Sequence, residues 1–382
     1  MRKELVFVLL ALFLCAGCNG NKKKMNGEHD LDAANITLDD HTISFYYNWY
    51  RNPSVDGEMK HWMHPIAPAP GHSGDAGAIS GLNDDIACNF YPELGTYSSN
   101  DPEIIRKHIR MHIKANVGVL SVTWWGESDY GNQSVSLLLD EAAKVGAKVC
   151  FHIEPFNGRS PQTVRENIQY IVDTYGDHPA FYRTHGKPLF FIYDSYLIKP
   201  AEWAKLFAAG GEISVRNTKY DGLFIGLTLK ESELPDIETA CMDGFYTYFA
   251  ATGFTNASTP ANWKSMQQWA KAHNKLFIPS VGPGYIDTRI RPWNGRTTRD
   301  RENGKYYDDM YKAAIESGAS YISITSFNEW HEGTQIEPAV SKKCDAFEYL
   351  DYKPLADDYY LIRTAYWVDE FRKARSASED VQ

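Results

Sequence analysis

The sequence predicts an α/β protein built as a single (β/α)8 barrel, or TIM barrel, with long loops on one face. Eight short apolar runs rich in β-branched and aromatic residues alternate with amphipathic stretches, which is typical of parallel strands covered by helices. Eight such repeats favour a closed barrel of one domain over an open, doubly wound sheet. No Gly-x-Gly-x-x-Gly motif follows the first run, which argues against a dinucleotide site.

The elements of the predicted barrel follow one another in a regular order. Strands are expected at 42–50, 117–125, 147–156, 188–194, 222–229, 242–250, 275–281 and 320–327. Amphipathic stretches between most of them predict helices at 102–115, 134–145, 163–175, 201–209, 262–272 and 306–317, and a closing helix at 355–375. Two long insertions, 51–100 and 282–303, each follow a strand. They should therefore rise over the face at which the strands end.

The first residues are predicted to direct export rather than to join the fold. Residues 1–17 combine a basic start, an apolar run and a small-residue region, and they resemble a bacterial lipoprotein signal peptide. Cys18 would then carry the lipid, 18–40 would be a flexible tether, and 41–382 would form the barrel domain. Ordinary secretion after Gly17 is the alternative. The apolar run is too short to span a bilayer, so membrane contact is expected through the lipid alone, at the periplasmic or surface face of the bacterial envelope.

The composition favours a neutral, polar partner. The net charge of −10 provides no basic footprint for nucleic acid. Aromatic residues make up 14% of the chain, including 10 Trp and 24 Tyr, and such rings stack on the apolar faces of sugars. The cysteines at 88, 150, 241 and 344 form no Cys-x-x-Cys pair, so zinc or redox chemistry has no support, while one disulfide among them remains open.

The richest stretch for chemistry is 320–338. Its first half has the pattern of a buried strand, and its second half contains Asn328, Glu329, His331, Glu332 and Glu337. Burying three unpaired carboxylates would cost several kcal/mol each, whereas charged residues just past a strand are typical of α/β-barrel active sites. A salt-bridged surface loop is the alternative, but no Lys or Arg follows until Lys342.

Glu329 and Glu332 are the strongest catalytic candidates. Glycoside hydrolysis requires one carboxylic acid to protonate the leaving oxygen and a second carboxylate near the anomeric carbon. Two Glu side chains in an aromatic pocket can hold different protonation states. Their spacing of three residues lets them share a site. A conventional double displacement, however, places its carboxylates on opposite sides of the scissile bond, so the spacing alone is a weak signal.

Other strand ends also present polar and aromatic residues. These are 45–50, 123–127, 152–155, 193–194 and 246–249. His152 and Glu154 are two residues apart and can face the same side of a strand, which suits a substrate-binding pair. A structural histidine, or metal ligation with a further carboxylate, are the alternatives, but no second histidine cluster converges with them.

Three motifs resemble glycoside hydrolase family 99, the endo-α-1,2-mannosidases and endo-α-1,2-mannanases. They are Asn328-Glu-Trp-His-Glu-Gly-Thr-Gln-Ile-Glu-Pro338, Phe45-Tyr-Tyr-Asn-Trp-Tyr50 and Phe151-His-Ile-Glu-Pro-Phe156. The resemblance runs from about residue 40 to the C-terminus and is to Bacteroides-type lipoprotein members. It implies a (β/α)8 barrel with neither metal nor cofactor. It also implies cleavage, with retention, of internal α-1,2-mannosidic bonds in yeast mannan or high-mannose N-glycans, releasing an α-1,3-linked Man-Man or Glc-Man disaccharide.

The resemblance also implies a role for each site residue. Glu332 would be the general acid and then base, and Glu329 would deprotonate the sugar's own 2-hydroxyl, which attacks the anomeric carbon to give a 1,2-anhydro sugar. Substrate contacts are expected from Tyr46, Trp124 or its neighbour Trp125, His152, Glu154, Tyr248 and Asn328.

Two other functions remain open at this point. One is a glycosidase of another specificity with Glu329 as a conventional nucleophile. The other is a surface lipoprotein that binds glycans without cleaving them, which would leave the acidic cluster after the eighth strand without a role. A monomer is expected for the protein.

Overall fold

The computed structural model describes residues 38–379, so the predicted signal peptide 1–17, Cys18 and most of the predicted tether lie outside the described residues. The main sheet is parallel. Its strands are β1 (Asp39–Tyr46), β5 (Val117–Trp124), β6 (Lys148–Ile153), β8 (Lys187–Ile192), β9 (Leu223–Leu227), β10 (Gly244–Tyr246), β11 (Leu276–Ile278), β12 (Ser280–Val281) and β13 (Ile322–Ile324). The short β7 (Arg183–Thr184) pairs with β8 in the antiparallel sense.

The sheet closes on itself at Pro279. Its strand order is β11-β10-β9-β8-β6-β5-β1-β13-β12, and a single residue, Pro279, separates the two outermost strands. Proline has no N–H and therefore interrupts a ladder, but the Pro279 carbonyl still accepts the Ser323 N–H at 3.0 Å. Counted as one strand, β11 and β12 close an eight-stranded barrel, which confirms the predicted (β/α)8 fold.

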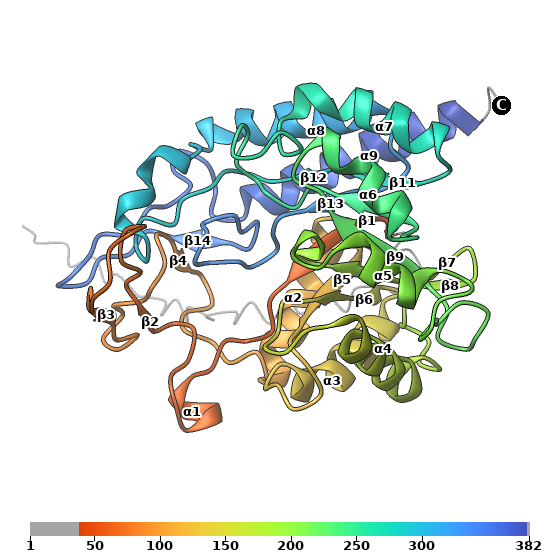
Figure 1. The fold of residues 1–382 in the computed structure, drawn as a ribbon. Coiled ribbons are helices and arrows are strands. Elements are labelled where there is room, and N and C mark those ends of the chain that lie inside the picture. Colours follow the sequence, from red (N-terminus) through yellow and green to blue (C-terminus); the bar gives the residue numbers. More distant parts are fainter. Residues whose placement is uncertain (1–37, 380–382) are drawn as a thin grey trace, which may run out of the picture. The chain divides into compact units, whose positions relative to one another are not determined.

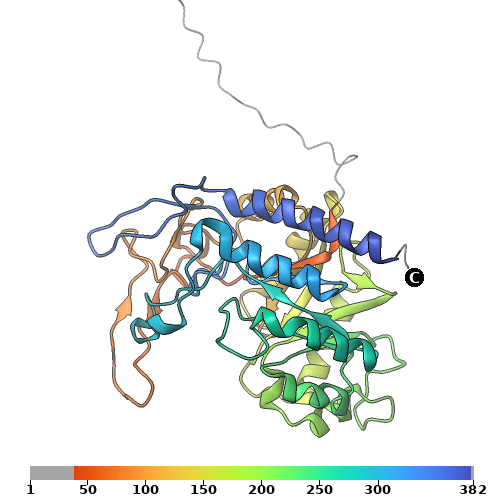
Figure 2. The same cartoon turned by 90° about the horizontal axis from the view of Figure 1, so that it is seen from above.

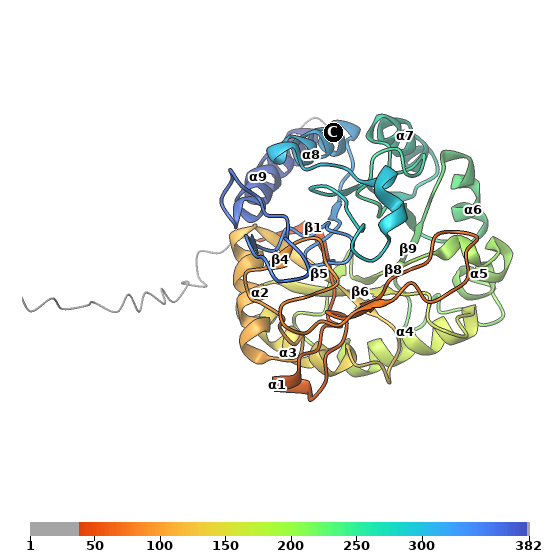
Figure 3. The same cartoon turned by 90° about the vertical axis from the view of Figure 1, so that its left-hand side faces the viewer.

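A ring of helices surrounds this barrel, as Figure 3 shows. The helices are α2 (Pro102–Lys114), α3 (Asn132–Lys144), α4 (Pro161–Tyr175), α5 (Pro200–Phe207), α6 (Leu234–Thr239), α7 (Trp263–Ala272), α8 (Lys305–Ser317) and α9 (Tyr359–Glu379). Asp101 caps α2 ahead of Pro102, and Ser160 forms a capping box at α4. The predictions missed α6, which is too short to show a helical period.

The strands end earlier than predicted, and one begins earlier. β1 was expected at 42–50 and β10 at 242–250, but both stop at a tyrosine, Tyr46 and Tyr246. The residues that follow leave the ladder; Tyr248, for example, has a left-handed backbone with φ 51°. At the other end, β1 reaches back to Asp39, inside the predicted tether, because the Asp39 carboxylate binds Thr42 and Arg375.

The two insertions gather with the segment after β13 at one end of the barrel (Figures 1 and 2). The first insertion contains α1 (Pro53–Asp56), the hairpin of β2 (His64–Pro65) with β3 (Ala78–Ile79), and β4 (Tyr91–Pro92). β4 pairs with β14 (Ala339–Val340), beyond β13. The second insertion contains the 3-10 turns η5 (Pro292–Thr297) and η6 (Glu302–Gly304). Further 3-10 turns are η2 (Ser195–Leu197), η3 (Glu231–Glu233) and η4 (Pro260–Asn262).

Two further observations concern the described part of the chain. Its four cysteines, at 88, 150, 241 and 344, are free thiols, so the open question of a disulfide among them is answered within residues 38–379. None of the helices within that range is long and apolar enough to cross a membrane.

Candidate active site

Asn328 fixes the start of the loop that follows β13. Its side chain is fully buried, and its amide bonds to both backbone polar groups of Tyr47, the residue after β1. Oδ1 accepts the Tyr47 N–H at 2.7 Å, and Nδ2 donates to the Tyr47 carbonyl at 2.9 Å. The polar atoms of Asn328 are thus engaged within the protein, and its predicted contact with substrate stays a prediction. Asn328 registers the loop against the first strand.

Glu329 and Glu332 both lie on this loop, at the end of the barrel where the insertions gather. The Glu329 N–H donates to Ser326 Oγ at 2.7 Å, and its carboxylate accepts the His331 N–H at 3.1 Å. Burial, and then the Glu332 charge, raise the pKa of Glu329 well above its usual range. Burial also raises the pKa of Glu332, to about 7, against the opposing charge of Arg291. The pair therefore holds a proton near neutral pH, which is the state that acid and base catalysis require.

The second insertion supplies the positive charge beside Glu332. Asp287 is fully buried and accepts hydrogen bonds from Tyr285 Oη at 2.9 Å, Arg291 Nη1 at 2.9 Å and Asn294 Nδ2 at 2.9 Å. This cluster orients the Arg291 guanidinium near the acidic pair. The sequence placed Tyr285 and Arg291 in a loop over the strand ends but contained no pattern that connected them to Glu332.

His152 and Glu154 form another wall of the same site. His152 Nε2 lies 2.6 Å from Tyr246 Oη, its Nδ1 lies 3.1 Å from Glu154 Oε1, and Thr123 Oγ1 donates to that oxygen at 2.5 Å. The Glu154 charge raises the pKa of both Glu329 and Glu332. The structure therefore brings His152 and Glu154 to the acidic pair, on the same side of β6 as the period of two predicts.

Tyr248 reaches the site from the end of β10 and meets Tyr47. Its N–H donates to Ser280 Oγ at 2.7 Å, and its hydroxyl is hydrogen-bonded to the Tyr47 hydroxyl. Burial, and charges that include Glu332, raise the pKa of both phenols well above the usual value. Both hydroxyls therefore stay neutral; one donates to the other, and the accepting hydroxyl keeps its hydrogen for a ligand.

Tyr46 and Trp124, two predicted substrate contacts, direct their polar atoms toward surrounding helices. The Tyr46 hydroxyl lies 2.8 Å from His108 Nδ1 of α2, and Trp124 Nε1 donates to Asn167 Oδ1 of α4 at 2.6 Å. Side chains alternate along a strand, so the neighbours Tyr47 and Trp125 take the inner positions. The position of Phe45 indicates which of Tyr46 and Tyr47 faces inward. Phe45 packs against His152 inside the barrel at 4.6 Å between ring centroids, which places Tyr47 on the inner side.

The first insertion adds an aromatic and histidine wall. Trp49 stacks on His61 with 4.6 Å between ring centroids and 2° between planes, and it lies 6.5 Å from Trp125 and 6.2 Å from His331. Burial lowers the pKa of His61 and of His331 to about 3. Both imidazoles are therefore neutral, and this side of the site combines flat apolar surface with uncharged polar atoms.

Glu337 belongs to the loop but not to the acidic pair. It is fully buried, and its carboxylate accepts Tyr97 Oη–H at 2.9 Å and Trp330 Nε1–H at 3.0 Å and lies 3.2 Å from His108 Nε2. These groups link the loop to the first insertion and to α2. Of the three carboxylates that drew attention in the sequence, this one holds the loop in place.

Potential metal ligands cluster at the other end of the barrel. Within residues 38–379, three potential ligand atoms come within 4.8 Å of one another at Asp39, Asp40 and His41. These residues begin β1, so they lie at the end of the barrel opposite to Glu329 and Glu332. His152 and Glu154, the alternative metal pair, are instead hydrogen-bonded to Tyr246 and Thr123.

A sequence model of glycosyl hydrolase family 99 matches residues 37–373. The chain belongs to this family. The mouse protein named glycoprotein endo-alpha-1,2-mannosidase is 48% identical over 347 residues, which cover 87% of this chain and 75% of that protein. The human glycoprotein endo-alpha-1,2-mannosidase-like protein is 47% identical over 346 residues, which cover 87% of this chain and 76% of that protein.

A solved structure extends this likeness to the fold. The GH99 endo-alpha-mannosidase from Bacteroides thetaiotaomicron is 99% identical, with a TM-score of 0.88, and the match covers 89% of this chain and 99% of that one. The chain is therefore a glycoside hydrolase. In this family 99 barrel, two glutamates with raised pKa values lie on one loop, with neutral tyrosines, neutral histidines and a third carboxylate, Glu154, around them.

Proposed function

We propose that this family 99 hydrolase is an endo-acting, retaining α-mannosidase. It cleaves internal α-1,2-mannosidic bonds of yeast mannan or high-mannose N-glycans and releases an α-1,3-linked disaccharide, Man-Man or Glc-Man. The observation that carries this proposal is the pair of Glu329 and Glu332 on one loop, whose pKa values are both raised. The endo-α-1,2-mannosidase names of the mammalian relatives support the choice of bond.

In the first half of the reaction, Glu332 acts as the acid and Glu329 as the base. Glu329 takes the proton of the sugar 2-hydroxyl, and O2 forms a bond to the anomeric carbon. The bond from that carbon to the leaving oxygen breaks, and Glu332 protonates the departing oxygen. A pKa of about 7 keeps a large share of Glu332 protonated at neutral pH and lets it give up its proton readily.

In the second half, the two glutamates exchange roles. Glu332 takes a proton from water, the water oxygen bonds to the anomeric carbon, and the bond from that carbon to O2 breaks. The protonated Glu329 returns its proton to O2. Each half inverts the anomeric carbon, so the product keeps the configuration of the substrate.

The placement of the two glutamates favours this route over a conventional nucleophile. They are three residues apart on one loop, and the Glu329 carboxylate is tied by the His331 N–H. A base for the 2-hydroxyl needs to reach only that oxygen within about 2.6 to 3.2 Å. It does not need to reach the far face of the anomeric carbon, as the nucleophile of a double displacement must.

Substrate contacts are proposed for residues that face the acidic pair. Glu154 accepts hydrogen bonds from sugar hydroxyls beside His152, the bonded pair of Tyr248 and Tyr47 donates one phenol O–H, and Trp125 offers an aromatic face. The proposal omits Tyr46 and Trp124 because their side chains contact helices.

The N-terminal segment is proposed to place the enzyme on the bacterial envelope as a monomer. Support comes from the sequence of residues 1–17 followed by Cys18 and a polar tether. The measurement is membrane fractionation of the full chain and of Cys18→Ser in the native host. Loss of membrane association in the variant supports the anchor, and unchanged association contradicts it. Size-exclusion chromatography with light scattering tests the monomer.

The deciding experiment for the activity uses the soluble protein beginning near Leu31 and debranched yeast α-mannan. Product size and anomeric configuration are followed by proton NMR from the first minutes. Release of a disaccharide that is first α-configured supports an endo-acting, retaining enzyme. A β-configured first product overturns the mechanism, and binding without turnover favours a non-catalytic glycan binder. A stable adduct of a fluorinated sugar on Glu329 would contradict the anhydro-sugar route.

A further inference from the structure

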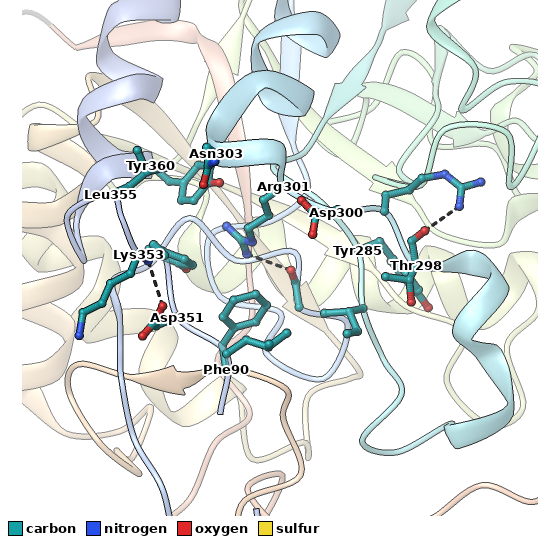
Figure 4. Close-up of a pocket in the computed structure, with 15 residues that line it drawn as sticks. Phe90, Tyr285, Thr298, Asp300, Arg301, Asn303, Asp351, Lys353, Leu355 and Tyr360 are labelled. Atoms are coloured by element: carbon teal, nitrogen blue, oxygen red, sulfur yellow. Dashed lines mark hydrogen bonds between the residues drawn. The ribbon is translucent and has the colours of Figure 1, made fainter. Parts of the chain in front are cut away.

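Arg301 grips the loop directly after Glu332. Its Nη2 donates to two backbone carbonyls, those of Gly333 and Gln335, each at 2.9 Å. Arg301 comes from the second insertion, just ahead of α8, and thus from outside the loop that it holds. Figure 4 shows its guanidinium directed at this loop, between Phe90 and Tyr360.

Three aromatic rings from distant parts of the chain enclose the guanidinium. Its Cζ lies 4.7 Å from the ring centroid of Phe90, 4.7 Å from that of Tyr352 and 4.6 Å from that of Tyr360. Each such cation–π contact contributes about 0.5 to 2 kcal/mol, depending on how far it is removed from water. The cage therefore fixes the orientation of the two N–H groups that hold the loop.

The cage is itself bonded to the loop. The Tyr352 hydroxyl donates to the Glu337 carbonyl at 2.8 Å and accepts the Gln335 side-chain amide at 3.0 Å. Arg301, its aromatic partner Tyr352 and the loop therefore form one connected unit.

The backbone of Glu332 is consequently fixed at successive carbonyls. Its own carbonyl accepts the Ile286 N–H at 2.8 Å, and the next carbonyl, that of Gly333, accepts Arg301. The turn between them is tight: Gly333 has φ 60°, and a Cβ there would lie 2.7 Å from the Ile286 carbonyl oxygen. No side chain fits at this position, so Ile286 and Arg301, both from the second insertion, fix the backbone position of Glu332.

We propose that Arg301 is a positioning residue for Glu332 as the general acid, an inference that rests on the acid role in the proposed function. Displacing a catalytic group by about 1 Å can reduce a rate by about 10²-fold. The planar guanidinium matches this task because its faces pack on the rings while one nitrogen, Nη2, holds both carbonyls. A lysine ammonium is a point charge on a flexible stem and has no planar faces, so its donors would not be oriented by the rings.

The site also permits a rescue experiment. A cavity of about 170 Å³ borders Arg301 and is lined by residues that include Thr298, Asp300 and Tyr360 (Figure 4). Removal of the Arg301 side chain would enlarge it by the volume of a guanidinium group. Added methylguanidinium can then occupy the aromatic cage and restore the donor to Gly333 and Gln335.

The test measures kcat/KM of Arg301→Lys, Arg301→Ala and Glu332→Gln on two substrates. One is the glycan, and the other is a dinitrophenyl glycoside of the same disaccharide. A dinitrophenolate departs with little help from an acid, so a misplaced acid should matter only for the glycan. We expect kcat/KM on the glycan to fall about 30- to 100-fold in both Arg301 variants, with less than about a threefold change on the activated substrate. Methylguanidinium should restore Arg301→Ala, and urea of similar shape should not.

Arg299→Lys is the matched control. Arg299 lines the same cavity but donates to the carbonyls of Thr252 and Thr298, away from the catalytic loop. Its variant should keep both activities. Equal losses of Arg301→Lys on the two substrates, or unchanged kcat/KM on the glycan, would overturn the positioning role. If Glu332→Gln also lost both activities equally, the acid role in the proposed function would fail instead. Arg301→Lys keeps the test decisive should Arg301→Ala not fold.

Discussion

Glu337 and the pair of Glu329 and Glu332 are carboxylates on one loop with opposite surroundings. The carboxylate of Glu337 is met by a phenol, an indole N–H and an imidazole. The carboxylate of Glu329 accepts the His331 N–H and faces a second carboxylate, that of Glu332, across the site. Glu329 and Glu337 are both buried, whereas Glu332 is partly exposed, so burial alone does not separate the catalytic carboxylates from Glu337. The hydrogen-bond donors around each carboxylate do.

The difference has an energetic meaning. A buried carboxylate surrounded by donors is stabilised as an anion and contributes to folding. A buried carboxylate next to another one is costly as an anion and retains a proton. The loop therefore keeps its stabilising contacts at Glu337 and its chemical reactivity at Glu329 and Glu332.

The strongest test of the comparison removes the reactive carboxylates. Glu332→Gln and Glu329→Gln should each lower kcat/KM on the glycan by about 10³-fold or more, because proton transfer at the two oxygens is lost. Both variants should unfold at the same or a higher urea concentration than the unchanged protein, since a costly charge pair disappears. Activity assays and urea titrations measure this. A variant that keeps activity, or that loses several kcal/mol of stability, would contradict the assignment.

The second test removes the donor-rich carboxylate. Glu337→Ala should lower the free energy of unfolding by about 3 to 5 kcal/mol, because the groups from Tyr97, Trp330 and His108 would lose their common acceptor. Glu337→Gln is the control, since it keeps an acceptor oxygen and should lose much less. Equal midpoints of urea unfolding for Glu337→Ala and the unchanged protein would show that the network does not stabilise the fold.

The third test uses pH. The pKa of Glu332 is about 7 in the folded chain, against about 4.3 for an unfolded Glu. Between these values the folded chain binds more protons than the unfolded chain, so the free energy of unfolding must fall as pH rises through this window. The contribution of Glu332 to this fall is on the order of 3 kcal/mol at most. Urea titrations from pH 4 to 8 should show a shallower fall for Glu332→Gln, and parallel curves would refute the raised pKa.

The smallest effect concerns a single donor to Glu337. Tyr97→Phe removes only the hydroxyl that donates to Glu337 at 2.9 Å and should cost about 2 kcal/mol, the usual contribution of a hydrogen bond to a charged group. Tyr366→Phe serves as the control because Tyr366 is 47% exposed. If the two variants had the same stability, Tyr97 would not contribute to holding the carboxylate.

The sequence predicted features that depend on local pattern. The eight strands and most of their helices follow from alternation. Glu329, Glu332 and Glu154 lie just past strands, and His152 lies near the end of β6. The orientations of Tyr46 and Tyr47 were not predicted, although the inner position of Phe45 determines them. The same period of two separates Trp125 from Trp124.

Other features could not be predicted because their partners lie far apart in the chain. The cage around Arg301 needs Phe90, Tyr352 and Tyr360, which no spacing or motif connects. Two of the groups around Glu337 come from α2 and the first insertion, and the third is Trp330 of its own loop. The sequence singled out Glu329 and Glu332 but contained no sign of the structural role of Glu337. The partners that distinguish them are set by tertiary packing.

The grip of Asn328 on Tyr47 makes hydrolysis depend on closure of the barrel. The two residues are separated by 281 positions, and they follow β13 and β1, which pair in the closed ring of strands. A chain in which these two strands are unpaired would lack the anchor of the loop that carries Glu329 and Glu332. Recovery of turnover during refolding should therefore accompany the pairing of β13 with β1.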